Sequence, residues 1–189
     1  MDRLGLYHAI FTDPTSREQL SPDTSSWKAA YGFLNAGALG DEFAGPVYSW
    51  LVRGGEDAYL AWTLAALAPW DGVENPNGGQ EKRRLQHVPL IARAAREGIM
   101  APNKVYNMTI ESHAHRREIL ELKRLVCCGA ESRARRDIFG MAIRRWNKRT
   151  GNWRLPVVYA ILVDAMGELK DWPVESSGEY SALLVLECH

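Results

Sequence analysis

Basic side chains are the residues of this sequence whose types and spacing best support a binding chemistry. From Glu81 to Arg149 there are 17 Lys and Arg residues against 7 Asp and Glu, although the chain of 189 residues has a formal net charge of zero. Such a block is a candidate contact surface for a polyanion, because its cations can pair with phosphates. The alternative, equally open, is a solvated helical surface whose charge is cancelled by acidic neighbours in the fold.

A catalytic or metal-binding constellation is harder to assemble. His113 and His115 are two residues apart, so on a helix their side chains point about 200° from one another and cannot share one metal ion. His115 falls on an apolar stripe and is expected to be partly buried. No nearby Cys or carboxylate completes a metal set, and the three cysteines lack a zinc spacing. We therefore expect no catalytic residue, no metal and no cofactor in this chain.

Helical periodicity prevails over strand patterns, and it predicts an all-α fold of about seven or eight helices. Residues 56–67 are apolar nearly all round, which is typical of a buried central helix. Turn residues are densest between positions 71 and 80, where Asp-Gly, Asn-Pro and Asn-Gly-Gly occur in succession. We therefore expect a helical lobe over residues 1–70, a loop over 71–80 and a basic helical lobe over 81–189. Further helices are expected at residues 27–39, 81–96, 102–127, 131–147 and 153–169.

The expected helix over residues 131–147 carries a basic face. On a helical wheel Arg133, Arg136 and Arg144 share one arc. The opposite arc holds Ala134, Ile138 and Ala142, and we expect it to face the core.

The tryptophans divide between the two parts of the chain. Trp146 and Trp153 lie in or beside a run of basic residues, so they are the aromatic candidates for stacking on RNA bases. Four others sit among apolar residues in the acidic part and are expected in the core: Trp27, Trp50, Trp62 and Trp70.

No apolar stretch of the sequence is long and uninterrupted enough to span a bilayer. The first residues include Asp2, Arg3 and Gly5, with neither the apolar core of a signal peptide nor an Arg- and Ser-rich transit pattern. We expect an intracellular protein without membrane contact. The choice between cytoplasm, nucleus and mitochondrion stays open, as does the oligomeric state.

Several segments of the chain resemble the fungal CCA-adding tRNA nucleotidyltransferases. They are residues 2–15, 22–27 and 61–70, Arg96-Glu97-Gly98 with Ala101-Pro102-Asn103-Lys104, and the helix that begins at Trp153-Arg154. In that family the corresponding region follows the catalytic head, and similar proteins are often described as poly(A) polymerase C-terminal-region-like. The resemblance implies a helical body and tail region that holds the acceptor stem and elbow of tRNA through shape and phosphate contacts.

The catalytic motifs of that family are missing from this chain. Nucleotidyl transfer needs carboxylates that hold two metal ions and a Gly-rich turn that places the triphosphate, but the sequence has no Asp-x-Asp pair. Glu56-Asp57 lacks the Arg of the family's Glu-Asp-x-x-Arg element. Arg135-Arg136-Asp137 resembles a head-domain motif, but it lies inside a helical pattern. We therefore expect no nucleotide transfer by this chain alone.

The basic block and the resemblance together predict a tRNA-binding region whose partner is tRNA or a tRNA-like RNA. The resemblance departs at both ends, where relatives continue, and a gene-model fragment and a truncated paralogue stay open as explanations. A protein-interaction or scaffold module and a degenerate fragment without its own role are the alternative functions. Six basic residues are the leading candidates for phosphate contact: Lys104, Arg133, Arg136, Arg144, Lys148 and Arg149.

Overall fold

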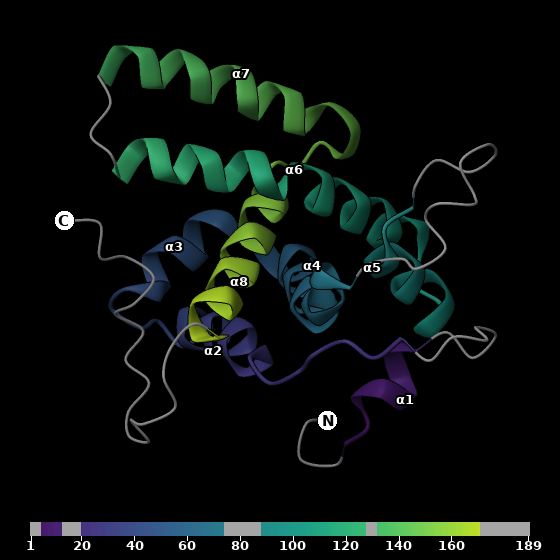
Figure 1. Ribbon diagram of the computed structural model, residues 1–189. Helices are drawn as coiled ribbons and strands as arrows, with labels where there is room; N and C mark the ends of the chain where they lie inside the picture. Colours follow the sequence, from purple (N-terminus) through teal and green to yellow (C-terminus); the bar gives the residue numbers. More distant parts are fainter. Residues whose placement is uncertain (1–4, 13–19, 74–87, 128–131, 171–189) are drawn as a thin grey trace.

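The computed structural model describes residues 5–12, 20–73, 88–127 and 132–170, and every regular element within these ranges is helical (Figure 1). A 3-10 helix (Ala68–Gly72) continues α4, and a π-helical turn (Ala94–Gly98) continues α5. The all-α prediction and the expected number of helices are confirmed for this part of the chain. The α-helices, in chain order, are α1 (Tyr7–Phe11), α2 (Trp27–Ala38), α3 (Ala44–Leu51), α4 (Gly54–Leu67), α5 (Leu90–Arg93), α6 (Asn103–Cys127), α7 (Ser132–Thr150) and α8 (Arg154–Lys170).

Helix α8 occupies the centre of the molecule. Its Leu155, Val158, Tyr159 and Leu162 follow three- and four-residue steps and are buried. It packs against α6, α2 and α4 (Figure 1). The larger hydrophobic core joins these side chains to residues of α1, α2, α3 and α4. This core therefore draws on both sides of the 71–80 segment, and the division into two lobes stays a prediction.

Helix α4 differs from the buried central helix that its composition suggests. Most of its residues from 60 to 67 are buried, but Tyr59 is 56% exposed and Trp62 is 38% exposed. The cause is that α4 packs on α2 and α8 and leaves another side to solvent. Trp50, in α3, is also 56% exposed. The expected core position is therefore wrong for Trp50 and Trp62, and it is confirmed for Trp27 and Trp70.

The last turn of α4 anchors the N-terminal helices. The Trp27 indole Nε1 donates to the carbonyl of Ala65 at 2.9 Å, and the Tyr7 hydroxyl donates to the carbonyl of Ala66 at 2.8 Å. The Ala65 carbonyl also accepts the backbone N–H of Ala68, so Trp27 adds a second donor there. Carbonyl groups in the last turn of a helix are the ones open to such side-chain donors. Burial also raises the pKa of Tyr7 well above its ordinary value, which keeps the hydroxyl protonated as a donor.

Helices α6 and α7 form an antiparallel pair at one side of the molecule. Trp146 of α7 bonds to Glu118 of α6, whereas Arg149, one turn later, bonds to Glu111, earlier in α6. A later residue of α7 therefore bonds to an earlier residue of α6, which is the pattern of two antiparallel helices. A smaller core, which includes Ile119, Leu122, Ala142 and Trp146, seals the pair. Figure 1 places α7 at the edge of the molecule farthest from α1.

The remaining boundaries refine the expectations. Helix α6 confirms the predicted helix over residues 102–127, and Pro102 directly precedes it. Helix α5 begins after Pro89 rather than running through it, because proline fits the start of a helix better than its interior. The other expected residues of that helix, 81–87, lie outside the described residues, as do positions 74–80 of the predicted loop. No helix within the described ranges is long and apolar enough to cross a membrane.

Candidate functional site

Helix α7 presents basic side chains to solvent because its apolar residues are fixed against α6. Ala142 and Trp146 are buried, and Phe139 and Ile143 pack partly buried beside them. Successive residues of an α-helix turn by about 100°, so Arg144 lies on the side away from this apolar stripe. The structure accordingly leaves Arg144 exposed.

The predicted apolar arc of this helix is only partly right. Ala142 is buried, but Ile138 is 41% exposed. The stripe that packs on α6 is centred on the residues from Phe139 to Trp146, so Ile138 falls at its edge. The side chains of Arg133 and Ala134 lie outside the described residues.

Two carboxylates of α6 hold α7 in place. Glu118 accepts a hydrogen bond from Trp146 Nε1 at 2.8 Å and pairs with Arg145 Nη2 at 2.6 Å. Trp146 is only 3% exposed, so its indole fills the interface between the helices. The hypothesis that Trp146 stacks on RNA bases is therefore wrong.

Glu111 is a buried carboxylate and the second anchor of α7. It pairs with Arg149 Nη1 at 2.8 Å, and His115 Nε2 lies 3.3 Å from its other oxygen. The His115 side chain is 18% exposed, which confirms the expectation that it is partly buried. A buried carboxylate needs such partners because an isolated buried charge is costly.

Three of the six predicted RNA contacts lie together on α7 without a counterion. Arg136, Arg144 and Lys148 are exposed and make no ion pair with any residue that the structure describes. We call these three residues the basic face. They span about 18 Å along the helix, with Arg136 about 80° round the axis from Arg144. Asp137 is also exposed on this side of α7 and lowers the local positive charge.

The other three candidates are not part of this face. Arg149 is 73% exposed, but its guanidinium pairs with Glu111. Lys104 lies in the first turn of α6 and pairs with Glu56 of α4. The side chain of Arg133 lies outside the described residues. RNA contact by any of the six stays a prediction.

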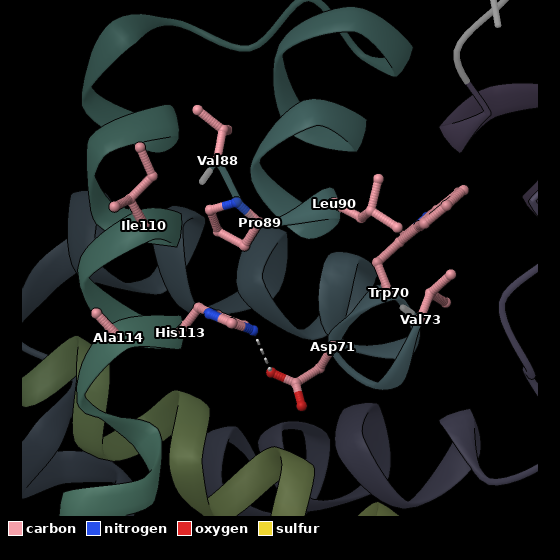
Figure 2. Close-up of a pocket in the computed structure, with 9 residues that line it drawn as sticks. All are labelled: Trp70, Asp71, Val73, Val88, Pro89, Leu90, Ile110, His113 and Ala114. Atoms are coloured by element: carbon pink, nitrogen blue, oxygen red, sulfur yellow. Dashed lines mark ion pairs between the residues drawn. The ribbon is translucent and has the colours of Figure 1, made fainter. Parts of the chain in front are cut away.

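A second cluster, which the sequence did not reveal, surrounds Asp71 in the 3-10 helix, and Figure 2 shows its Asp71 and His113 members. Its carboxylate is 4% exposed, pairs with Arg116, and accepts a hydrogen bond from the Tyr159 hydroxyl at 2.6 Å. The Nε2 atom of His113 lies 3.8 Å from Asp71 Oδ1. Burial raises the pKa of Tyr159 far above its ordinary value and lowers that of His113. Tyr159 therefore donates as a neutral phenol, and the cluster links the 3-10 helix, α6 and α8.

A cavity of about 380 Å³ opens beside Asp71 and His113. Figure 2 shows that its other lining side chains are apolar. They come from the 3-10 helix and Val73 directly after it, from Val88, Pro89 and Leu90 at the start of α5, and from α6. None of its nine lining residues carries a hydroxyl or thiol. Its two ionisable side chains are His113 and Asp71, and the Asp71 carboxylate is already held by Arg116 and Tyr159. Among the described residues, no group of three or more His, Cys, Asp or Glu side chains could hold a metal ion.

Comparisons with known proteins give one informative match. No family model matches the chain, and no solved structure matches it. The chain is 44% identical over 174 residues, or 92% of its length, to a curated protein of Purpureocillium lilacinum named Nucleotidyltransferase lcsQ. The match covers 29% of that protein's length. Over these residues, the chain is therefore similar, and related, to part of a protein named as a nucleotidyltransferase.

Proposed function

We propose that this chain binds the phosphate backbone of a folded, tRNA-like RNA through the basic face of α7. One observation carries the proposal: Arg136, Arg144 and Lys148 are exposed without a counterion among the described residues. The neighbouring cations Arg145 and Arg149 are engaged in holding α7 on α6. The similarity to part of Nucleotidyltransferase lcsQ supports a role related to nucleotidyl transfer. The resemblance to CCA-adding enzymes is what suggests RNA as the ligand.

The proposed recognition is by charge and shape rather than by base sequence. The major groove of duplex RNA is too narrow for side chains, so duplexes are bound mainly through phosphates and 2′-hydroxyls. Each phosphate that pairs with a cation releases counterions, which makes binding dependent on salt concentration. In this proposal the chain holds RNA for a tRNA 3′-end reaction and itself contributes no catalytic residue.

The experiment replaces Arg136, Arg144 and Lys148 together by Ala and measures affinity for a tRNA at several salt concentrations. The control replaces Lys28, Arg93 and Arg117 by Ala, which removes the same net charge from α2, α5 and α6. Arg93 and Arg117 pair with Glu97 and Glu121 in their own helices, so the control is matched in charge and not in pairing. The basic-face variant should bind more weakly, and its salt slope should shrink by about one unit or less per lost contact. The control variant should stay close to the wild type.

A single substitution tests the same face in the opposite direction. Asp137→Asn removes an exposed negative charge from α7, so it should strengthen tRNA binding, with the largest gain at low salt. If both α7 variants keep the wild-type affinity and salt slope, and circular dichroism shows that their helix content is retained, the basic face of α7 does not bind tRNA.

A protein-interaction module is the second candidate function, because the end of the α6–α7 pair exposes apolar side chains. Leu125, Val126, Ile138 and Met141 are between 41% and 64% exposed. Exposed apolar groups of this kind can mark protein contacts. Binding of an acidic polypeptide in preference to tRNA, lost on Met141→Asp, would favour this function.

A further inference from the structure

Two tryptophans and one arginine meet where α3 ends and α8 begins. Trp50 and Trp153 pack edge to face, with ring centroids 5.5 Å apart and an angle of 67° between the ring planes. The Arg154 Cζ atom lies 5.0 Å from the Trp153 ring centroid and 6.0 Å from that of Trp50. We call these three residues the aromatic corner. Trp50 is 56% exposed, so much of its indole is open to a ligand.

Polar contacts behind the aromatic corner fix its backbone. Asn152 Nδ2 donates to Asp57 Oδ1 at 2.9 Å, and Asn152 Oδ1 accepts from the backbone N–H of Arg154 at 3.2 Å. Asp57 Oδ2 in turn accepts from the backbone N–H of Arg53 at 3.1 Å. The first residue of α8 is thereby tied to the first turn of α4.

Arg154 is a cation without a counterion in this arrangement. It makes no ion pair with a described residue, and its buried Nε atom has no hydrogen-bond partner. Of the two carboxylates in the first turn of α4, Glu56 pairs with Lys104. Asp57 accepts from the uncharged Asn152 side-chain and Arg53 backbone N–H groups and keeps its negative charge, but it makes no ion pair with Arg154. The planar fork of a guanidinium matches phosphate oxygens, whereas a cationic ligand would be repelled. The unpaired guanidinium of Arg154 therefore favours an anionic ligand.

We propose that the aromatic corner binds an unpaired nucleotide of an RNA strand, with the base stacked on Trp50 and a phosphate on Arg154. An indole accepts any base, because every base has a π-face, and an adjacent arginine adds attraction for the backbone. Trp153 follows Thr150, the last residue of α7, by only three residues. The aromatic corner is therefore close along the chain to the helix that carries the basic face. The proposal rests on the proposed function, since it assigns a single-stranded segment to the RNA whose folded part contacts the basic face.

The test measures binding of a short single-stranded RNA and of a tRNA to the whole chain and its variants. Trp50→Ala should weaken single-strand binding on the order of 10- to 100-fold without changing the salt slope, because the ring is uncharged. Trp50→Phe keeps a stacking ring and should lose less. Arg154→Gln should weaken binding and lower the salt slope by about one unit or less. Tyr59→Ala is the matched control, because Tyr59 is also 56% exposed but has no ring partner among the described residues.

The outcomes separate this proposal from the proposed function. Equal single-strand affinity of Trp50→Ala and Tyr59→Ala overturns the aromatic corner but leaves the result for the basic face untouched. A loss confined to Trp50→Ala, with no effect of the basic-face variant, supports the corner and overturns the proposed function. Free AMP or CMP that competes as strongly as the strand, or an acidic peptide that binds with the same dependence on Trp50, overturns the assignment to an RNA strand.

Discussion

Buried carboxylates decide which cations of the basic block remain available. Asp71 engages Arg116, and Glu111 engages Arg149, so neither guanidinium is a free phosphate ligand. A buried carboxylate that loses its partner is strongly destabilising, and these cations are therefore retained for stability. Charge counting along the sequence cannot separate such residues from Arg144, because the difference lies in what each side chain faces.

The His113 imidazole should make the stability of the fold depend on pH. Burial lowers its pKa below the ordinary value of 6.5, so the folded state binds a proton less readily than the unfolded state. The neutral His113 therefore costs the folded state nothing above pH 6.5. As the pH falls from there through the folded-state pKa, the free energy of unfolding decreases. Asp71 and Arg116, which face the same space, have opposite charges. Urea unfolding between pH 5 and pH 8 measures the effect.

The comparison variant for this prediction is His113→Gln, which keeps a polar side chain but does not titrate. Its free energy of unfolding should fall less between pH 7 and pH 5 than that of the wild type. Parallel curves for the two proteins would mean that another group produces the pH dependence.

Helix α7 is attached by a narrow set of contacts, and Arg149 is one of them. Arg149→Gln removes the guanidinium from a buried Glu111 and should lower the free energy of unfolding by about 1–2 kcal/mol. Arg144→Gln removes the same charge from the same helix at an exposed position without an ion pair among the described residues, so its effect should stay within about 0.5 kcal/mol. Hydrogen exchange of the α7 amides should accelerate for Arg149→Gln alone. Equal effects of the two substitutions would contradict this account of the anchor.

Helical spacing is a local property, so the elements could be predicted from the sequence while their exposed faces could not. The predicted helices over residues 102–127 and 153–169 match α6 and α8 closely. Trp50, Trp62 and Trp146 were misplaced because the burial of an aromatic ring depends on which helix packs over it. Nothing in the local pattern around Trp146 distinguishes it from an exposed tryptophan beside arginines. The pairing of Trp50 with Arg154 joins residues about a hundred positions apart and has no signal in the sequence.

Acidic residues elsewhere in the fold cancel part of the positive charge of the basic block. The structure therefore combines the two interpretations of that block, a contact surface for a polyanion and a helical surface neutralised by acidic neighbours. Lys123 pairs with Asp164 at 2.5 Å, Arg116 with Asp71, and Lys104 with Glu56, so the basic block meets the acidic remainder at three places. The basic face stays outside this cancellation among the described residues. The molecule therefore keeps a local positive surface on α7 at zero net charge, which favours contact with a polyanion there.

The shared core predicts that the molecule unfolds in one step. Side chains of α8 pack into the same core as those of α1 to α4, so neither end of the chain can unfold without exposing the other's apolar surface. Urea transitions followed by far-UV circular dichroism and by tryptophan fluorescence should coincide. Two separated transitions would instead support the division of the chain into two lobes near residues 71–80.

The whole chain should hold RNA without extending it. In-line transfer of a nucleotide requires metal-bound carboxylates and a triphosphate cradle that fix the reacting groups. The sequence has no Asp-x-Asp pair, and the lining of the described cavity offers one carboxylate, Asp71, which Arg116 and Tyr159 already engage. Incubation with a tRNA lacking its 3′ end, CTP, ATP and Mg²⁺ should therefore give no product above a control without protein, although the same preparation binds the tRNA. Extension that survives Asp71→Asn would require a catalytic centre elsewhere in the chain. Extension abolished by that substitution would place the chemistry in the cavity only if the variant keeps the wild-type helix content and still binds the tRNA.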